Sequence, residues 1–232
     1  MRKICIGTQS KNLQEALLLT PLPALLKEKD PGLKIYSYFR GFNPVVFQAN
    51  PWIDGIAYLP KEILGTNFLQ SEEKKVKNQM KPEIYLTHSE RQKCKKFIQN
   101  HSFLENTQKP LCLVHARGQG EEKTAPIEFW DAIIAQWGNE IRFWQIGLEN
   151  DSAIQGCEYY YFSSHRKSNV RKLFALMSLS NAFLGVQSSP VDIARAFHIP
   201  TFLIQKNLSP LSDSSHKLDD FLKEIAANSI GG

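Results

Sequence analysis

Short apolar runs alternate with helical and polar segments through the first half of the chain. The apolar runs predict strands at residues 3–7, 33–38, 55–58 and 84–87. Leucines recur at helical spacing at positions 13, 17, 18, 22, 25 and 26. Pro21 and Pro23 fall inside that leucine run, so we expect a kink or a restarted helix there. Residues 61–81 are polar and rich in lysine, which predicts a loop, and Ser89 is expected to cap a charged helix that continues through Gln99.

The same alternation restarts after a polar stretch at residues 100–110, which we interpret as a linker. Strands are predicted at 111–115, 142–146, 159–162, 183–186 and 201–204. Helices are predicted at 126–137, 168–178, 190–197 and 218–226. In the first of these helices, Pro126 suits the first turn and the apolar side chains line one face.

Alternating strands and helices are typical of α/β proteins, in which parallel sheets are flanked by helices. Because the pattern restarts after the linker, we expect two Rossmann-like lobes, residues 1–105 and residues 106–232. In such sheets ligands bind beyond the carboxyl ends of the strands, so the strand-to-helix junctions are where functional residues are expected.

Composition narrows the class of protein without identifying its function. The chain has 232 residues, 42% hydrophobic and 22% charged, which is enough to bury a core and predicts no long disordered region. Its net charge of +5 suits a phosphate-bearing ligand or an anionic membrane surface but is also common in proteins that bind neither. The four cysteines show no Cys-x-x-Cys pair, and the sequence has neither a secretory signal nor a membrane span, so we expect a reduced, cytoplasmic protein.

The first junction that could carry chemistry is the segment 116–124. Two glycines would let backbone amides approach an anion, and Arg117 and Lys123 could neutralise a diphosphate. The alternative is a solvated loop that happens to be charged, since the segment has neither the Walker spacing nor a dinucleotide fingerprint.

The second junction, residues 145–151, places a carboxylate just after a strand. Glu149 there is suited to accept hydrogen bonds from ribose hydroxyls. The alternative is that Asn150 or Asp151 caps a following helix.

At the third junction, residues 185–192, small hydroxyl residues precede a proline that begins a helix. Ser188, Ser189 and the amides of that helix terminus would form an anion cradle. Ser-Ser-Pro is also a common helix cap, so a purely structural role stays open.

In the first lobe, Gln14 and Glu15 begin the leucine helix close to the end of the first strand. Glu15 could act as a general base on an acceptor hydroxyl, or simply supply a favourable charge in the first turn of a helix. The six histidines show no metal-ligand spacing and no Gly-x-Ser-x-Gly motif is present. Tyr159–Tyr161 beside Arg166 and Lys167 could suggest nucleic acid, but they fall on a predicted strand, so we expect no nucleic-acid partner.

Several segments, taken together and in order, resemble the bacterial heptosyltransferases, glycosyltransferase family 9, which have the two-lobed GT-B fold. In the first lobe, Gln14–Pro21 (QEALLLTP) and Lys29–Ile35 (KDPGLKI) resemble the family's opening Gly-Asp, apolar run and Thr-Pro. Asn50–Ile56 (NPWIDGI) resembles its "n-P-x-i-d-x-i" phrase. In the second lobe, Lys123–Trp130 (KTAPIEFW) resembles "K-x-W-P-x-e-x-w", and Gly185–Ala194 (GVQSSPVDIA) resembles "G-x-D-[ST]-G-x-x-H-x-A".

The resemblance implies transfer of a sugar from a nucleotide-diphosphate donor to a glycan or lipid-linked acceptor, with no metal or other cofactor. It places the donor on the second lobe and takes Glu15, in the first lobe, as the catalytic base. Lys123 and the helix that starts at Ser188 and Ser189 would face the diphosphate, and Glu149 the nucleoside. The donor-binding residues it implies are Arg117, Lys123, Glu149, Gln187, Ser188, Ser189 and Asp192. Such an enzyme would be cytoplasmic and could contact the inner membrane peripherally.

The chain departs from the family pattern at its most characteristic positions. The family's Gly-Asp is Gln14-Glu15 here, and the first lobe is short. The family's Asp, Gly and His are Gln187, Ser189 and Asp192. A non-catalytic module of the same fold, which binds a nucleotide, a glycan or a partner enzyme, is therefore the second hypothesis. An unrelated Rossmann protein such as a methyltransferase is disfavoured, because no glycine-rich turn follows the first strand.

Overall fold

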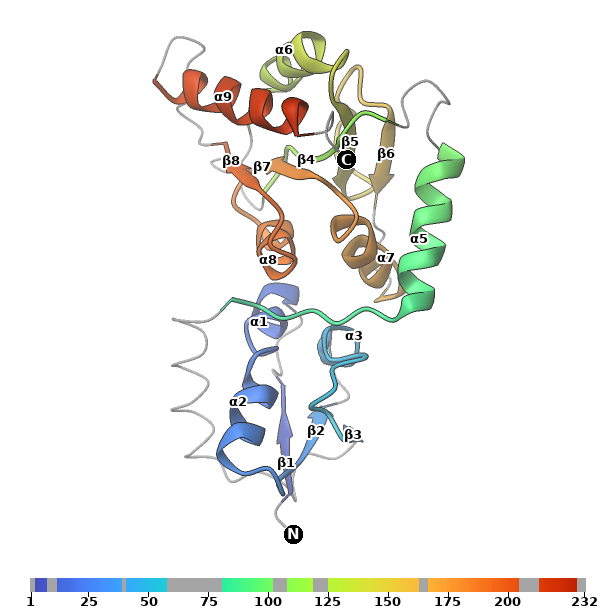
Figure 1. Cartoon of the computed structure of the whole chain (residues 1–232), viewed down its shortest axis with the longest axis vertical. Coiled ribbons are helices and arrows are strands. Elements are labelled where there is room, and N and C mark those ends of the chain that lie inside the picture. The colour runs from blue at the N-terminus through green and yellow to red at the C-terminus, as the bar shows by residue number, and fades with distance from the viewer. Residues whose placement is uncertain are drawn as a thin grey trace. The chain divides into compact units, whose positions relative to one another are not determined.

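The computed structural model describes residues 3–7, 12–38, 41–57, 81–101, 108–118, 125–162, 167–204 and 213–228. The chain divides into two compact units, which are residues 1–88 with 195–197, and residues 89–194 with 198–232. Each unit has its own parallel sheet with helices packed beside it, so the predicted α/β class is confirmed (Figure 1). The change between units falls at His88 and Ser89, whereas the sequence pattern placed the boundary between residues 105 and 106.

The first unit is built on three parallel strands in the order β1-β2-β3. These are β1 (Lys3–Ile6), β2 (Lys34–Tyr38) and β3 (Gly55–Ala57). The helices are α1 (Leu13–Leu17), α2 (Leu22–Lys29) and the short α3 (Asn43–Val46), which the sequence pattern did not predict. As expected from the two prolines, the leucine run is two helices, with Pro21 at the N-cap of α2 and Pro23 in its first turn. The unit is held together by buried apolar side chains on α1, α2 and β2.

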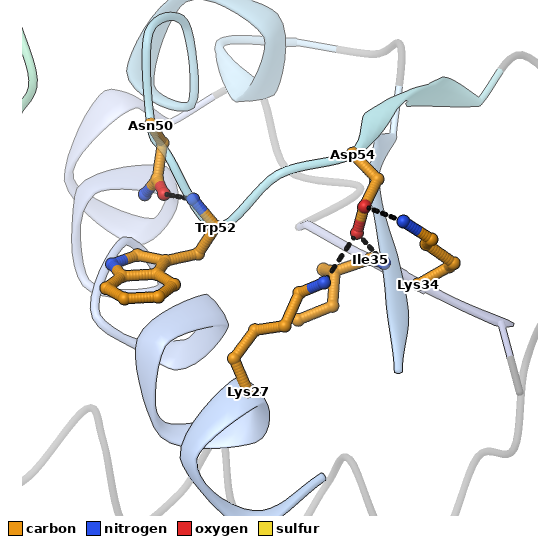
Figure 2. Close-up of polar contacts among 6 residues, drawn as sticks. All are labelled: Lys27, Lys34, Ile35, Asn50, Trp52 and Asp54. Atoms are coloured by element: carbon orange, nitrogen blue, oxygen red, sulfur yellow. Dashed lines mark hydrogen bonds and ion pairs between the residues drawn. The ribbon is translucent and has the colours of Figure 1, made fainter. Parts of the chain in front are cut away.

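A charged cluster ties the loop before β3 to the rest of the first unit (Figure 2). Asp54 accepts hydrogen bonds from Lys34 Nζ at 2.8 Å, from the Ile35 amide at 2.9 Å and from Lys27 Nζ at 2.9 Å. These contacts, led by the one from Lys34, hold the pKa of the Asp54 carboxyl well below its ordinary value. Nearby, Asn50 Oδ1 accepts from the Trp52 amide at 2.9 Å and closes the predicted Asn-Pro turn (Figure 2).

The strand predicted at residues 84–87 is absent: no strand lies within the described segment 81–87. Instead, the Glu83 amide donates to Thr20 Oγ1 at 2.7 Å, where α1 gives way to α2. Pro82 and Ile84 are buried while Glu83 and Tyr85 are half-buried. The alternation of buried and half-buried residues is the pattern that predicted a strand. The backbone is instead held by the side chain of Thr20 and does not pair with a neighbouring strand.

The second unit contains a larger, five-stranded parallel sheet in the order β6-β5-β4-β7-β8. Its strands are β4 (Leu111–His115), β5 (Arg142–Gly147), β6 (Tyr159–Phe162), β7 (Ala182–Gly185) and β8 (Thr201–Leu203). Its helices are α5 (His88–His101), α6 (Ile127–Trp137), α7 (Lys167–Met177), α8 (Ser189–Ala196) and α9 (Asp213–Ala227). These bounds agree with the predicted elements to within one or two residues, except that α9 begins five residues before the predicted 218.

Helices cover both faces of this sheet, with α6 and α9 on one side and α7 and α8 on the other (Figure 1). Cys112 and Val114 of β4 belong to the core that α6 and α9 complete. Helix α5 packs on the edge of the sheet through Phe97, whose ring meets those of Trp144 and Tyr159 edge-on. The tyrosines of β6 therefore serve the packing of the sheet, as the strand interpretation expected.

None of the helices in the described part of the chain is long and apolar enough to cross a membrane. All four cysteines are buried, and none of them forms a disulfide bond. Burial raises the pKa of the Cys94 thiol to about 11 and that of Cys157 to about 12.

Candidate functional site

The strand order of the second sheet defines where a ligand would bind. From β4 the chain first adds β5 and β6 on one side, and it later adds β7 and β8 on the other side. The direction of winding therefore reverses between β4 and β7, and in open α/β sheets this switch point is where a crevice opens beyond the carboxyl ends of the strands. His115 ends β4 and Gly185 ends β7, and the two residues are register partners.

A side-chain hydrogen bond spans this switch point. His115 Nδ1 lies 3.1 Å from Ser188 Oγ, and Ser188 Oγ also lies 2.9 Å from the Val186 carbonyl, to which it donates. The Val186 amide in turn donates to the His115 carbonyl at 3.1 Å. Gly185 permits this close packing, since a Cβ there would lie 2.8 Å from the His115 carbonyl oxygen. The loop after β7 is thus fixed to the end of β4 by both backbone and side-chain contacts.

His115 is a neutral imidazole over the physiological pH range. It is 8% exposed, and burial lowers its pKa from 6.5 to about 4, against the opposing effect of the nearby Asp151 charge. Sequence reasoning did not select His115, because the spacing of the histidines matches no metal site. The available signal was its position, since a histidine that ends an apolar strand faces the carboxyl edge of a parallel sheet.

The turn after β5 is closed by Asp151. Its Oδ2 atom accepts from the Leu148 amide at 2.8 Å, and its Oδ1 atom lies 4.0 Å from Arg117 Nη1. A Cβ on Gly147 would overlap Asp151 Oδ2, so a larger residue there would displace the carboxylate that closes the turn. No helix begins here, because residues 148–158 are all described and contain none. The helix-cap interpretation of Asp151 was therefore wrong: its carboxylate closes the turn and faces the guanidinium that follows β4.

The other predicted donor-binding residues occupy different depths at this edge. Gln187 and Glu149 are exposed in the loops after β7 and β5, and Ser189 is half-buried at the start of α8. Asp192, in the first turn of α8, is only 4% exposed and makes polar contacts. Lys123 lies outside the described residues. Ser188 is not a side-chain cap of α8, because its hydroxyl contacts His115 and the Val186 carbonyl.

These residues give one edge of the second sheet a defined chemical character. Arg117 supplies an exposed cation, with 57% of its side chain accessible, and the start of α8 supplies the positive end of a helix dipole. His115 supplies a buried imidazole, and Asp151 supplies a carboxylate close to Arg117. Such a site can hold an anion together with a group that carries hydroxyls. No cluster of three or more His, Cys, Asp or Glu side chains suited to a metal occurs among the described residues.

Glu15 belongs to the first unit, in the first turn of α1, where its side chain is exposed. Asn12 caps this helix by accepting from the Gln14 amide at 2.9 Å. The position suits both interpretations of Glu15, a general base and a favourable charge at a helix N-terminus, so the choice between them rests on experiment.

Comparison with known proteins finds a relationship of structure. No family model and no curated protein sequence matches the chain. A glycosyl transferase family 9 protein from Veillonella parvula DSM 2008 matches with a TM-score of 0.67 and 13% identity, over 86% of this chain and 79% of that one. The E. coli ADP-heptose lps heptosyltransferase II matches with a TM-score of 0.67 and 10% identity over 100% of both chains. E. coli heptosyltransferase WaaC, solved with ADP-2-deoxy-2-fluoro heptose, gives a TM-score of 0.56 and 11% identity over 97% of this chain and 99% of that one. The predicted fold is confirmed: the chain has the GT-B-like fold of the heptosyltransferases.

Proposed function

We propose that this protein is a glycosyltransferase that moves a sugar from a nucleoside-diphosphate donor to a glycan or lipopolysaccharide-type acceptor. The observation that carries the proposal is the coincidence of a heptosyltransferase fold over the whole chain with a polar cluster at the switch point of the second sheet. An ADP-linked heptose is the first candidate donor, because the structurally similar WaaC was solved with ADP and with an ADP-linked fluoro-heptose.

The donor would bind at the carboxyl edge of the second sheet. Arg117 and Lys123 would neutralise the diphosphate together with the amides at the start of α8, so the leaving group would be stabilised without a metal ion. Glu149, exposed after β5, would accept hydrogen bonds from the nucleoside. Gln187 would contact the sugar as a neutral amide, and the buried Asp192 would support the start of the helix.

The chemical step would be a displacement at the anomeric carbon of the donor sugar. Glu15 would take the proton of the acceptor hydroxyl, whose oxygen then forms a bond to the anomeric carbon. The bond from that carbon to the diphosphate breaks, and the nucleoside diphosphate departs with the electron pair. Catalysis would come from position and from electrostatic stabilisation of an oxocarbenium-like transition state. A lipid-linked acceptor would bring the enzyme to the cytoplasmic surface of the inner membrane.

The donor class can be tested by a thermal-shift screen of ADP-, UDP-, GDP- and CMP-linked sugars. A ligand that binds only the native state stabilises it by a free energy that grows with the logarithm of the ligand concentration over Kd, about 2.7 kcal/mol at 100 Kd. This stabilisation raises the melting temperature. The proposal predicts that one nucleotide class raises the melting temperature. If none does at millimolar concentration, the protein is not a nucleotide-sugar enzyme.

The role of Glu15 has a direct test in the variant Glu15→Gln, assayed for sugar transfer or donor hydrolysis with the selected donor. A general base contributes about 10²–10⁴-fold to rate, so turnover should fall by that factor while donor affinity stays unchanged. Glu28→Gln, an exposed glutamate on α2 of the same unit, is the matched control and should retain full turnover. Equal turnover in the two variants would reject Glu15 as the base.

A specific observation favours the second hypothesis, a non-catalytic module of the same fold. The resemblance places an aspartate at position 187, whereas the chain has an exposed glutamine that carries no charge. Such a module would bind a nucleotide sugar or a glycan without turnover, and Glu15→Gln would then change nothing measurable. Donor binding combined with no turnover in the unmodified protein would favour it over the enzyme.

A further inference from the structure

The hydrogen bonds of Ser188 at the switch point determine which nitrogen of the His115 ring carries the proton. Ser188 Oγ has two neighbours, the Val186 carbonyl at 2.9 Å and His115 Nδ1 at 3.1 Å, and it carries a single proton. The carbonyl can only accept a hydrogen bond, whereas an imidazole nitrogen can donate or accept one. Both contacts are satisfied when the hydroxyl donates to the carbonyl and Nδ1–H donates to the hydroxyl oxygen.

This arrangement fixes the tautomer of the ring. A neutral imidazole carries one N–H, so with the proton on Nδ1 the Nε2 atom has a lone pair and can only accept. The ring is neutral, since burial holds the His115 pKa at about 4. The hydrogen bond between the ring and the described residues is the one to Ser188, and it involves Nδ1 and not Nε2. The side chain is also more than nine-tenths buried.

We propose that His115 Nε2 accepts a hydrogen bond from a hydroxyl of the bound donor, and that Ser188 is a positioning residue that keeps this nitrogen unprotonated. The inference rests on the proposed function and names a specificity contact within it. The chemistry of the surroundings selects the class of ligand group. An ionised phosphate oxygen cannot donate to Nε2, and the nearby Asp151 carboxylate also disfavours an anion, so the group that faces His115 is a neutral hydrogen-bond donor, for which the hydroxyls of the donor are the candidates we test. The exposed cation of Arg117 then serves the phosphates.

Titration calorimetry on the full chain tests this contact with three probes: the nucleotide sugar selected by the screen, its nucleoside diphosphate, and inorganic pyrophosphate. Loss of one hydrogen bond to a buried acceptor costs up to about tenfold in affinity. His115→Phe should therefore lower the affinity for the nucleotide sugar about tenfold and leave the affinity for pyrophosphate unchanged. His115→Gln, which restores an acceptor, should recover most of that loss. If only the nucleotide sugar is affected, the hydroxyl belongs to the sugar, and if the nucleoside diphosphate weakens equally, it belongs to the ribose.

Ser188→Ala is the second variant and removes only the hydroxyl that sets the tautomer. The ¹⁵N chemical shifts of the His115 ring should show the proton on Nδ1 in the unmodified protein and a shift of the proton toward Nε2 in Ser188→Ala. Ser188→Ala should lower the affinity for the nucleotide sugar about threefold, which is less than the loss of a whole hydrogen bond. The affinity for pyrophosphate should again be unchanged. A purely structural role for Ser188 would not move the proton.

The proposal is overturned if His115→Phe binds the nucleotide sugar as tightly as the unmodified protein, or if its affinities for the sugar and for pyrophosphate fall equally. Should His115→Phe fail to fold, an unchanged tautomer and unchanged affinity in Ser188→Ala overturn it as well. If the unmodified protein binds no nucleotide sugar, the proposed function fails and this inference fails with it. Binding by the unmodified protein with no effect of either variant overturns this inference alone.

Discussion

At the scale of single residues, the site depends on two contacts that a sequence pattern does not contain. His115 meets Ser188 only because β4 and β7, 71 residues apart at the starts of the two strands, are neighbours in the sheet. Asp151 meets Arg117 only because β5 lies on the other side of β4. Arg117 and Ser188 were both predicted to face a ligand from their place after strands, whereas His115 and the role of Asp151 emerged from the pairing of the strands.

The depressed pKa of His115 predicts a specific loss of stability in mild acid. The folded-state pKa is about 4 and the unfolded value is 6.5, so below pH 6.5 the unfolded chain takes up a proton that the folded chain refuses. The free energy of unfolding should therefore fall by on the order of 2–3 kcal/mol between about pH 6.5 and pH 4. Urea unfolding of the unmodified protein and of His115→Gln at pH 7.5, 5.5 and 4.5 measures this contribution.

The difference in stability between pH 7.5 and pH 4.5 should be smaller in His115→Gln than in the unmodified protein. Asp54 does not confuse this comparison, because its pKa is depressed below 3.8 and its stabilising contribution is lost only at a lower pH. Identical pH dependence in the two proteins would show that His115 is not buried as a neutral ring.

At the scale of secondary-structure elements, hydrophobic periodicity predicted the two sheets well. The three central strands of the second sheet, β4, β5 and β7, are buried, so they are predicted from largely apolar runs, and amphipathic helices separate most of the strands. The errors came where tertiary contacts replace local pattern. The segment 81–87 is fixed by Thr20, and α3 is a single turn too short to show a period. Helix α5 belongs with the second unit because of contacts with residues far along the chain.

One of those contacts predicts how α5 is held. Glu90 receives two hydrogen bonds of 2.7 Å from the Nε and Nη2 atoms of Arg171 on α7, whose side chain is only 8% exposed. Glu90→Gln would leave that buried guanidinium without its countercharge. We expect a loss of about 2–3 kcal/mol in the free energy of unfolding, somewhat below the cost of breaking a fully buried pair because Glu90 is 20% exposed.

The control for this prediction is an exposed ion pair on α9. Asp220 lies 3.6 Å from Lys223, and the two side chains are 76% and 66% exposed. Asp220→Asn should change the free energy of unfolding by less than about 0.5 kcal/mol. Urea unfolding of both variants at neutral pH measures the difference, and equal stabilities would show that the Glu90–Arg171 pair does not hold α5 in place.

At the scale of the whole molecule, the sequence predicted two α/β units and resemblance supplied the heptosyltransferase fold, which the comparison of structures confirms. The boundary between the two units and the burial of each site residue could not be predicted from the sequence, because they depend on which helices pack on which sheet. The structure also shows the surroundings of two positions at which the chain departs from the family pattern. Gln187 is exposed in the loop after β7, whereas Asp192 is buried in the first turn of α8, so the two replacements fall in different environments.

Calorimetric titration of the selected nucleotide sugar into Arg117→Ala tests whether the carboxyl edge of the second sheet binds the donor through its diphosphate. A charge-assisted hydrogen bond contributes about 1.5–3 kcal/mol, so affinity should fall by about 10–100-fold relative to the unmodified protein. Lys172→Ala, which removes an exposed cation on α7, should bind as the unmodified protein does. Equal affinity in Arg117→Ala and Lys172→Ala would show that the donor diphosphate does not bind at this edge of the sheet.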